Sequence, residues 1–183
     1  MVKKLTIFDI VALYASDYFA GKYLREIALG LGKPHQTIKP YVEALVKEGI
    51  FKKTRRRNIV DYHLNMNDAR VFDYLTIAEK MRLLERIGHD TPLGILYERL
   101  SPFFTNNAFV IFGSAVEKIK KGSDIDLLVI GKADVRKIIK EFEEIYNKPV
   151  HLIHVKEKSQ LQKSFVIEVY KKHLILSNTE EII

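Results

Sequence analysis

The chain of 183 residues contains no cysteine. A protein without cysteine can form no disulfide and no thiolate zinc site, and it has no cysteine nucleophile. Long apolar runs are also missing, since none approaches the roughly 18 residues that span a bilayer. Met1 leads into an amphipathic pattern rather than the apolar core of a signal peptide. We therefore expect a cytoplasmic protein with no membrane association.

Positive charge is concentrated in the first third of the chain. The formal net charge is +7, and residues 1–66 hold 12 Lys and Arg against 6 Asp and Glu, whereas residues 67–183 hold 18 against 17. A basic excess confined to one region predicts a surface that faces a polyanion such as nucleic acid. The hydrophobic content of 47% is enough for one ordinary packed domain or two small ones.

Apolar residues recur at helical spacing through the first 50 residues. They predict a first helix over 7–18 that ends near Gly21, a second over 23–29, and a third over 35–48 that Gly49 stops. A glycine turn separates the second and third helices. Helix, tight turn, helix is the order of a helix-turn-helix unit, whose second helix presents its first residues to base edges in the DNA major groove.

The outward residues of the third predicted helix are His35, Gln36, Lys39 and Glu43, and the first three are its candidate DNA contacts. Pro40 lacks a backbone donor, so the helix is expected to start late or to bend there. Two predicted strands, 51–53 and 59–64, flank a hairpin tip over 54–58 that contains Arg55, Arg56 and Arg57. We expect this tip to lie against phosphate, although three arginines in a turn are also typical of a solvated loop.

The stretch 23–64 resembles winged helix-turn-helix regulators. The resemblance is carried by Leu31-Gly32, Thr37, Leu45 and Glu48-Gly49-Ile50. It implies that residues 1–66 form a DNA-binding domain, while a role of this domain in contacting proteins stays open.

A long helix is predicted over 67–87, capped by Asn67 or Asp68 and ended by Gly88. Its apolar stripe must be covered, either by its own chain or by the same helix of a second copy. We favour the second copy, because helix-turn-helix proteins commonly read two half-sites as homodimers. Residues 67–90 are thus assigned to a linker and dimerisation helix, and Asp90 or Thr91 is expected to cap a new helix from Pro92.

Two motifs in the second half predict phosphate and metal chemistry. An apolar run over 108–112 ends in Gly113-Ser114, and a helical segment after it would offer backbone N–H groups and a hydroxyl to a phosphate. Asp124 and Asp126 are two apart on a strand-like segment, so both carboxylates should point to one face. Paired carboxylates on an apolar strand repel each other unless a cation such as Mg²⁺ neutralises them.

Gly-Ser, a spacer, and the core Ser123-Asp124-Ile125-Asp126-Leu127 resemble the polymerase-β-type nucleotidyltransferases, in particular the minimal nucleotidyltransferases. The resemblance extends over residues 91–183. It implies that Gly113, Ser114, Ser123 and Lys118 bind an NTP, with ATP the expected one, and that Asp124 and Asp126 hold two Mg²⁺ or Mn²⁺ ions. An Arg-Gly pair usual in the family is missing, and Lys118, Lys120 and Lys121 are candidates to compensate for it.

The family usually has a third carboxylate on the next central strand. In this sequence the corresponding strand is 149–155, and the aligned position is His151. Imidazole accepts a proton but is a poor Mg²⁺ ligand. His154, three residues further on, should face the opposite side of the sheet.

The expected class is therefore α+β: a winged helix-turn-helix, a linker helix and a small mixed-sheet α/β nucleotidyltransferase-like domain. Two functions stay open. The first is DNA-bound transfer of a nucleoside monophosphate to a hydroxyl, with a HEPN-type protein as the acceptor that the resemblance implies. The second is transcriptional regulation by a domain that has lost catalysis and senses nucleotide or mediates assembly. Polymerase-like extension is disfavoured, since nothing in the sequence supplies a thumb-like domain.

Overall fold

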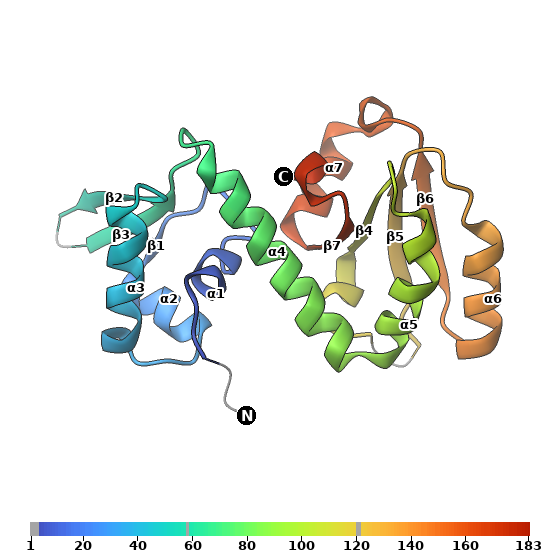
Figure 1. Ribbon diagram of the computed structural model, residues 1–183, viewed down its shortest axis with the longest axis horizontal. Helices are drawn as coiled ribbons and strands as arrows, with labels where there is room; N and C mark the ends of the chain where they lie inside the picture. Colours follow the sequence, from blue (N-terminus) through green and yellow to red (C-terminus); the bar gives the residue numbers. More distant parts are fainter. Residues whose placement is uncertain (1–3, 58, 120–121) are drawn as a thin grey trace. The chain divides into compact units, whose positions relative to one another are not determined.

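The structure is a computed structural model that describes residues 4–57, 59–119 and 122–183. The chain divides into two compact units, Met1–Ala78 and Glu79–Ile183, and the division falls inside helix α4 (Arg70–His89), as Figure 1 shows. Helices and strands are mixed in both units, which confirms the α+β class. No described helix is both long enough and apolar enough to cross a membrane.

The first unit has helices α1 (Ile7–Ala12), α2 (Leu24–Gly30) and α3 (His35–Lys47), and strands β1 (Lys22–Tyr23), β2 (Phe51–Arg56) and β3 (Ile59–Leu64). The strands form an antiparallel sheet in the order β1-β3-β2. Helix α3 follows α2 after a short turn and precedes the β2–β3 hairpin. This is the element order expected for the first third, with β1 added.

Helix α1 is shorter than predicted. It ends at Ala12 rather than near Gly21, and turns follow it. Tyr14 and Tyr18 are nevertheless buried, and the Tyr14 hydroxyl donates a 2.8 Å hydrogen bond to the carbonyl oxygen of Tyr62. Tyr14 and Tyr18 therefore follow the apolar spacing because they are buried, although the backbone that carries them is not helical.

Pro40 lies in the interior of α3, and the helix does not start late. The helix begins at His35, and the N–H groups of Thr37 and Ile38 both donate to the carbonyl of Pro34. Since Pro40 has no N–H, the carbonyl of Gln36 has no i+4 backbone donor. The rest of α3 compensates for this loss by burying Ile38, Val42 and Leu45.

The β2–β3 hairpin is longer and its tip tighter than predicted. The ladder continues to the pair Arg56↔Ile59, so Arg55 and Arg56 belong to strand β2 rather than to a loop. Arg57 follows with a left-handed φ of 54°. A tight turn of this kind matches strand twist better than the five-residue tip that was expected. Asn58 lies outside the described residues.

Helix α4 begins at Arg70, three residues after the predicted start, and it also ends later than predicted. The Asp68 carboxylate accepts from the Arg70 N–H at 3.0 Å, so Asp68 caps its first turn. Gly88 does not adopt positive φ, and the helix passes through it to His89. The predicted stop at Gly88 is therefore wrong. Along α4, Leu75 and Ala78 are buried within the chain, whereas Leu84 is 62% exposed.

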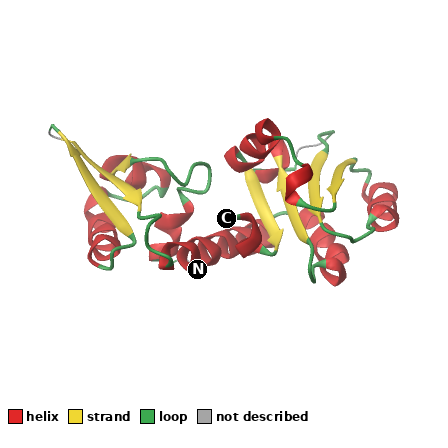
Figure 2. Ribbon diagram, turned by 90° about the horizontal axis from the view of Figure 1, so that it is seen from above, coloured by secondary structure: helices red, strands yellow, loops and turns green. Residues whose placement is uncertain are grey.

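The second unit is built on strands β4 (Ala108–Phe112), β5 (Ile125–Ile130), β6 (Val150–Val155) and β7 (His173–Ser177). Their order is β6-β5-β4-β7, with β5 and β6 parallel and the other pairs antiparallel. Helices α5 (Thr91–Leu100), capped by Asp90, and α6 (Arg136–Tyr146) cover one face, where they share an apolar cluster with the sheet. Helices α7 (Lys163–Lys171) and α8 (Thr179–Ile182) pack on the other face (Figure 2).

A cluster of polar side chains, centred on the buried Glu79 and His173, connects the second half of α4 to β7. The Nε2 atom of His173 lies 3.4 Å from the Glu79 carboxylate, and the two side chains are 1% and 2% exposed. His173 Nδ1 is 3.0 Å from the carbonyl of Tyr170, which can only accept, so Nδ1 carries a proton. Arg82 completes the cluster, since it pairs with Glu79 at 2.6 Å and donates to the carbonyl of His173.

We predict that Glu79→Ala lowers the free energy of unfolding by about 3–5 kcal/mol, because it leaves the buried His173 ring and the Arg82 guanidinium without their carboxylate partner. Urea denaturation would measure the loss. Glu98→Ala removes a carboxylate from the exposed side of α5 and should change stability by less than about 0.5 kcal/mol. Equal losses in the two variants would contradict a specific role of the buried pair.

Candidate functional site

The central feature of the site is the contact between the Gly113 turn and Asp126. Strand β4 ends at Phe112, which pairs with Asp126 of β5, and Gly113 follows with φ of 70°. A Cβ placed on Gly113 would lie 2.7 Å from Oδ2 of Asp126. The backbone conformation and the close carboxylate therefore both require glycine at this position.

His151 lies on the other side of Asp126. Strand β6 runs parallel to β5 with Asp126 opposite His151, and His151 Nδ1 is 3.2 Å from Asp126 Oδ1. The side chains of His151 and Asp126 are 65% and 29% exposed. The half-buried Asp126 carboxylate thus lies between a glycine turn and an exposed imidazole, because the strand register pairs Asp126 with His151.

Asp124 does not belong to the strand. Strand β5 begins at Ile125, whose N–H donates to the carbonyl of Pro149, and Asp124 is an exposed residue just before it. The prediction that both aspartates sit on one strand is wrong in this respect, because the ladder starts one residue too late to include Asp124. Ser123, also before the strand, is half-buried.

The segment after Gly113 is a single 3-10 turn, η2 (Gly113–Val116), rather than the expected longer helix. Ser114 and Lys118 are exposed there. The N–H of Gly113 donates to the carbonyl of Lys172 at 3.3 Å, so this donor already has a partner in the turn that leads into β7. Lys120 and Lys121 lie outside the described residues.

Arg86 is a structural residue of the site that sequence reasoning missed. Its Nε donates to the carbonyl of Val116 at 2.8 Å, and its Nη2 contacts the carbonyl of Ala115 and the Asp90 carboxylate. These bonds satisfy the last carbonyls of η2 and fix the turn that carries Ser114. No local motif marks Arg86, because its partners in η2 lie about one sixth of the chain away.

The described residues contain no group of three or more His, Asp or Glu side chains arranged to hold a metal ion. Glu117, which is 78% exposed, pairs with Lys172 at 3.0 Å. The Nε2 atom of His154 lies 2.9 Å from the carbonyl of Gly131. Among the described residues, Asp126 contacts the Gly113 turn and has His151 beside it, and the exposed Asp124 lies two residues before it in the chain.

In the first unit, the candidate DNA contacts His35, Gln36 and Lys39 are exposed on the first turns of α3, and Arg55 and Arg57 are exposed on the hairpin. Glu43, expected to face outward, is 39% exposed and accepts a 2.5 Å hydrogen bond from Lys53 of β2. This hydrogen bond lowers the pKa of Glu43. The link from α3 to the hairpin is thus complete at neutral pH and weakens as the pH falls through the lowered pKa.

We predict that Gly113→Ala both strains the backbone and displaces the Asp126 carboxylate. Strain at positive φ alone costs on the order of 1–3 kcal/mol. Gly122 provides a matched control, because its φ is 78° and nothing lies within 4 Å of a Cβ built on it. Gly122→Ala should share the strain but leave the ring signals of His151 unchanged in NMR spectra, whereas Gly113→Ala should shift them. Unshifted signals in both variants would contradict the contact.

Comparison with known proteins found a family match within the second unit. Residues 98–181 match the family described as Polymerase beta, Nucleotidyltransferase. The search of curated proteins found no match, and the search of solved structures found none. The family match supports a nucleotidyltransferase-type domain in the second half of the chain and, with it, nucleotidyl transfer in general.

Proposed function

We propose that the second unit binds an NTP with a divalent metal ion and transfers a nucleoside monophosphate to a hydroxyl acceptor, with the α–β phosphoanhydride bond broken and pyrophosphate released. We propose further that residues 1–66 attach this activity to DNA. The observation that carries the proposal is Asp126, held between the Gly113 turn and His151. ATP is the expected nucleotide. A HEPN-type protein remains the acceptor that the family resemblance implies, and the homodimer remains a prediction.

The donor set fits one magnesium ion. Mg²⁺ is usually held by one or two carboxylates together with substrate phosphates. Asp126, half-buried beside the turn, and the exposed Asp124, two residues before it in the chain, are the two carboxylates that we propose hold the ion. A bound ion would neutralise phosphate charge and act as a Lewis acid. A second ion would need a third carboxylate, and no such triad occurs among the described residues, so we propose one ion where the resemblance implied two.

His151 is proposed to accept the proton of the acceptor hydroxyl. An ionised carboxylate only accepts hydrogen bonds, so the contact with Asp126 places a proton on Nδ1 of His151. Nε2 then keeps its lone pair, and the ring is 65% exposed. A base oriented by a carboxylate is a recurring arrangement in general base catalysis. Asp126 would thus both ligate the metal and orient the base.

A regulator without turnover is the second candidate. The family resemblance puts His151 at the position of the usual third carboxylate, and this favours the regulator without turnover. The regulator is also favoured by Gly113, whose N–H already donates to Lys172. In this case the domain would bind nucleotide as a sensor.

Incubation with labelled NTPs, Mg²⁺ or Mn²⁺ and candidate partner proteins distinguishes the two candidates. Transfer predicts a labelled acceptor and loss of label in Asp126→Ala. His151→Asn should lower the rate by about 10²–10⁴-fold, the usual contribution of a general base, while NTP binding measured by calorimetry persists. Binding without labelling in the unaltered protein would favour the sensor, and absence of both would refute the nucleotide site.

DNA binding is proposed from charge and exposure in the first unit. The start of α3 and the β2–β3 hairpin present exposed basic and polar side chains, and residues 1–66 carry the basic excess. Helix α3 would enter the major groove, and the hairpin would lie along the phosphates. Phosphate contacts release counterions, so affinity should fall steeply with salt.

Replacement of Arg55, Arg56 and Arg57 by Ala should reduce the slope of log K against log salt by about 0.9 for each phosphate that the hairpin no longer neutralises. Fluorescence anisotropy with duplex DNA at several salt concentrations would measure it. The control removes three exposed positive charges from α6 instead, in Arg136, Lys137 and Lys140. The same slope in both triple variants would exclude the hairpin from the DNA interface.

A further inference from the structure

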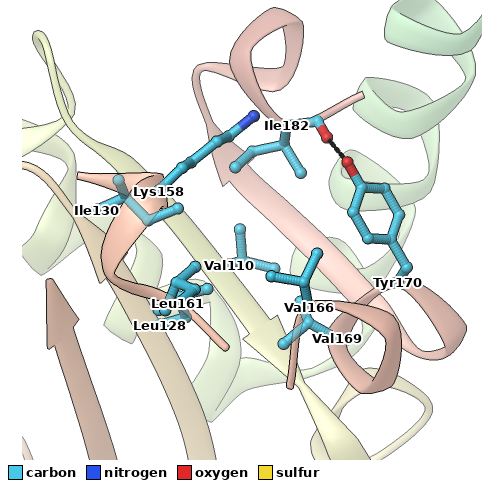
Figure 3. Close-up of a pocket in the computed structure, with 9 residues that line it drawn as sticks. All are labelled: Val110, Leu128, Ile130, Lys158, Leu161, Val166, Val169, Tyr170 and Ile182. Carbon is cyan, nitrogen blue, oxygen red and sulfur yellow. Dashed lines mark hydrogen bonds between the residues drawn. The ribbon is translucent and has the colours of Figure 1, made fainter. Parts of the chain in front are cut away.

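An apolar cavity of about 160 Å³ lies in the second unit, away from the Gly113 turn. Its sheet side is formed by Val110 of β4 and by Leu128 and Ile130 of β5. Val166 and Val169 of α7 face them, and Ile182 of α8 closes one end (Figure 3). A cavity of about 150 Å³ with such a lining accommodates a benzene ring.

The cavity opens on the sheet face that carries Asp126. Leu128 and Ile130 follow Asp126 at intervals of two residues along β5, so the three side chains share a face. At about 3.3 Å per residue, Leu128 stands roughly 7 Å from Asp126 along the strand. A molecule in the cavity would therefore lie next to the candidate functional site without contacting the polar side chains of that site.

Two polar side chains, those of Tyr170 and Lys158, border the cavity. The Tyr170 hydroxyl donates to the carbonyl of Ile182, which ties α7 to α8. Lys158, in the 3-10 turn η3 (Lys158–Gln160), projects along the rim (Figure 3). Lys158 is exposed, yet partial desolvation by the residues around it lowers the pKa of its ammonium group, and the Glu181 carboxylate partly offsets this effect. No described carboxylate lies within 4.0 Å of Lys158 Nζ.

We propose that this cavity binds a compact apolar carboxylate, with an aromatic ring or short branched chain among the aliphatic side chains and its carboxylate on Lys158. A single ammonium suits one negative charge, and the lining offers no guanidinium for a phosphate. A nucleobase is a poor fit, because its polar edges would be buried against valine, leucine and isoleucine without hydrogen-bond partners. The site is thus distinct from the proposed nucleotide site and does not depend on it.

Benzoate and its neutral analogue benzamide are the probes for the test, titrated into the full-length protein and followed by NMR. We expect benzoate to shift methyl signals of Val110, Leu128 and Val169 and to bind at least tenfold more tightly than benzamide. Lys158→Met should remove this preference. Lys156→Met, which neutralises an exposed lysine of the same segment, should preserve it. Glu181→Gln should strengthen benzoate binding, since it removes the competing carboxylate.

Val169→Phe tests the cavity itself, because it fills the space while keeping Lys158. It should abolish the binding of both probes, and a cooperative urea transition would show that the variant is folded. Equal binding of benzoate and benzamide, or a preference that survives Lys158→Met, would overturn the proposal. Absence of binding by benzoate and by 4-methylpentanoate, a branched alternative, would also overturn it.

Discussion

The antiparallel register of β4 and β5 is the constraint on which the candidate site depends. It sets Phe112 opposite Asp126, so the chain must turn at Gly113 directly beside a half-buried carboxylate. The parallel pairing of β5 with β6 then brings His151 to the other side of Asp126. A slip of one residue in either pairing would move Asp126 to the face covered by α5 and α6. The slip is opposed because it would bury the Asp126 carboxylate without a partner in the apolar cluster under α5 and α6.

The central strands could be predicted from the sequence because their signals are local. An unbroken apolar run that ends at Gly113 predicted β4, and the run from Asp124 predicted β5 with one residue too many at its start. Strand β6, which carries His151, was likewise predicted from the apolar residues around it. The Asp90 cap of α5 was readable for the same reason, since a capping residue lies next to the helix that it starts.

Other features could not be read, because they depend on partners distant in the sequence. Asp124 looked like a strand residue, yet the ladder begins at Ile125, where Pro149 supplies the first acceptor. The helical pattern around Glu43 gave no sign of its hydrogen bond with Lys53 of the hairpin. Arg86 carries no motif, but it satisfies the carbonyls of η2. Tertiary hydrogen bonds of this kind leave no periodicity for sequence analysis to detect.

The buried pair of Glu79 and His173 limits which substitutions homologues can carry at these two positions. The two positions are about half the chain apart, yet each side chain is nearly inaccessible and faces the other's charge or proton. Replacing one alone leaves an uncompensated polar group in the core, while replacing both by apolar residues of similar volume can be neutral. Residues 79 and 173 should therefore be substituted together in homologues. Correlated substitution at the two positions would indicate that a homologue keeps the contact between α4 and β7.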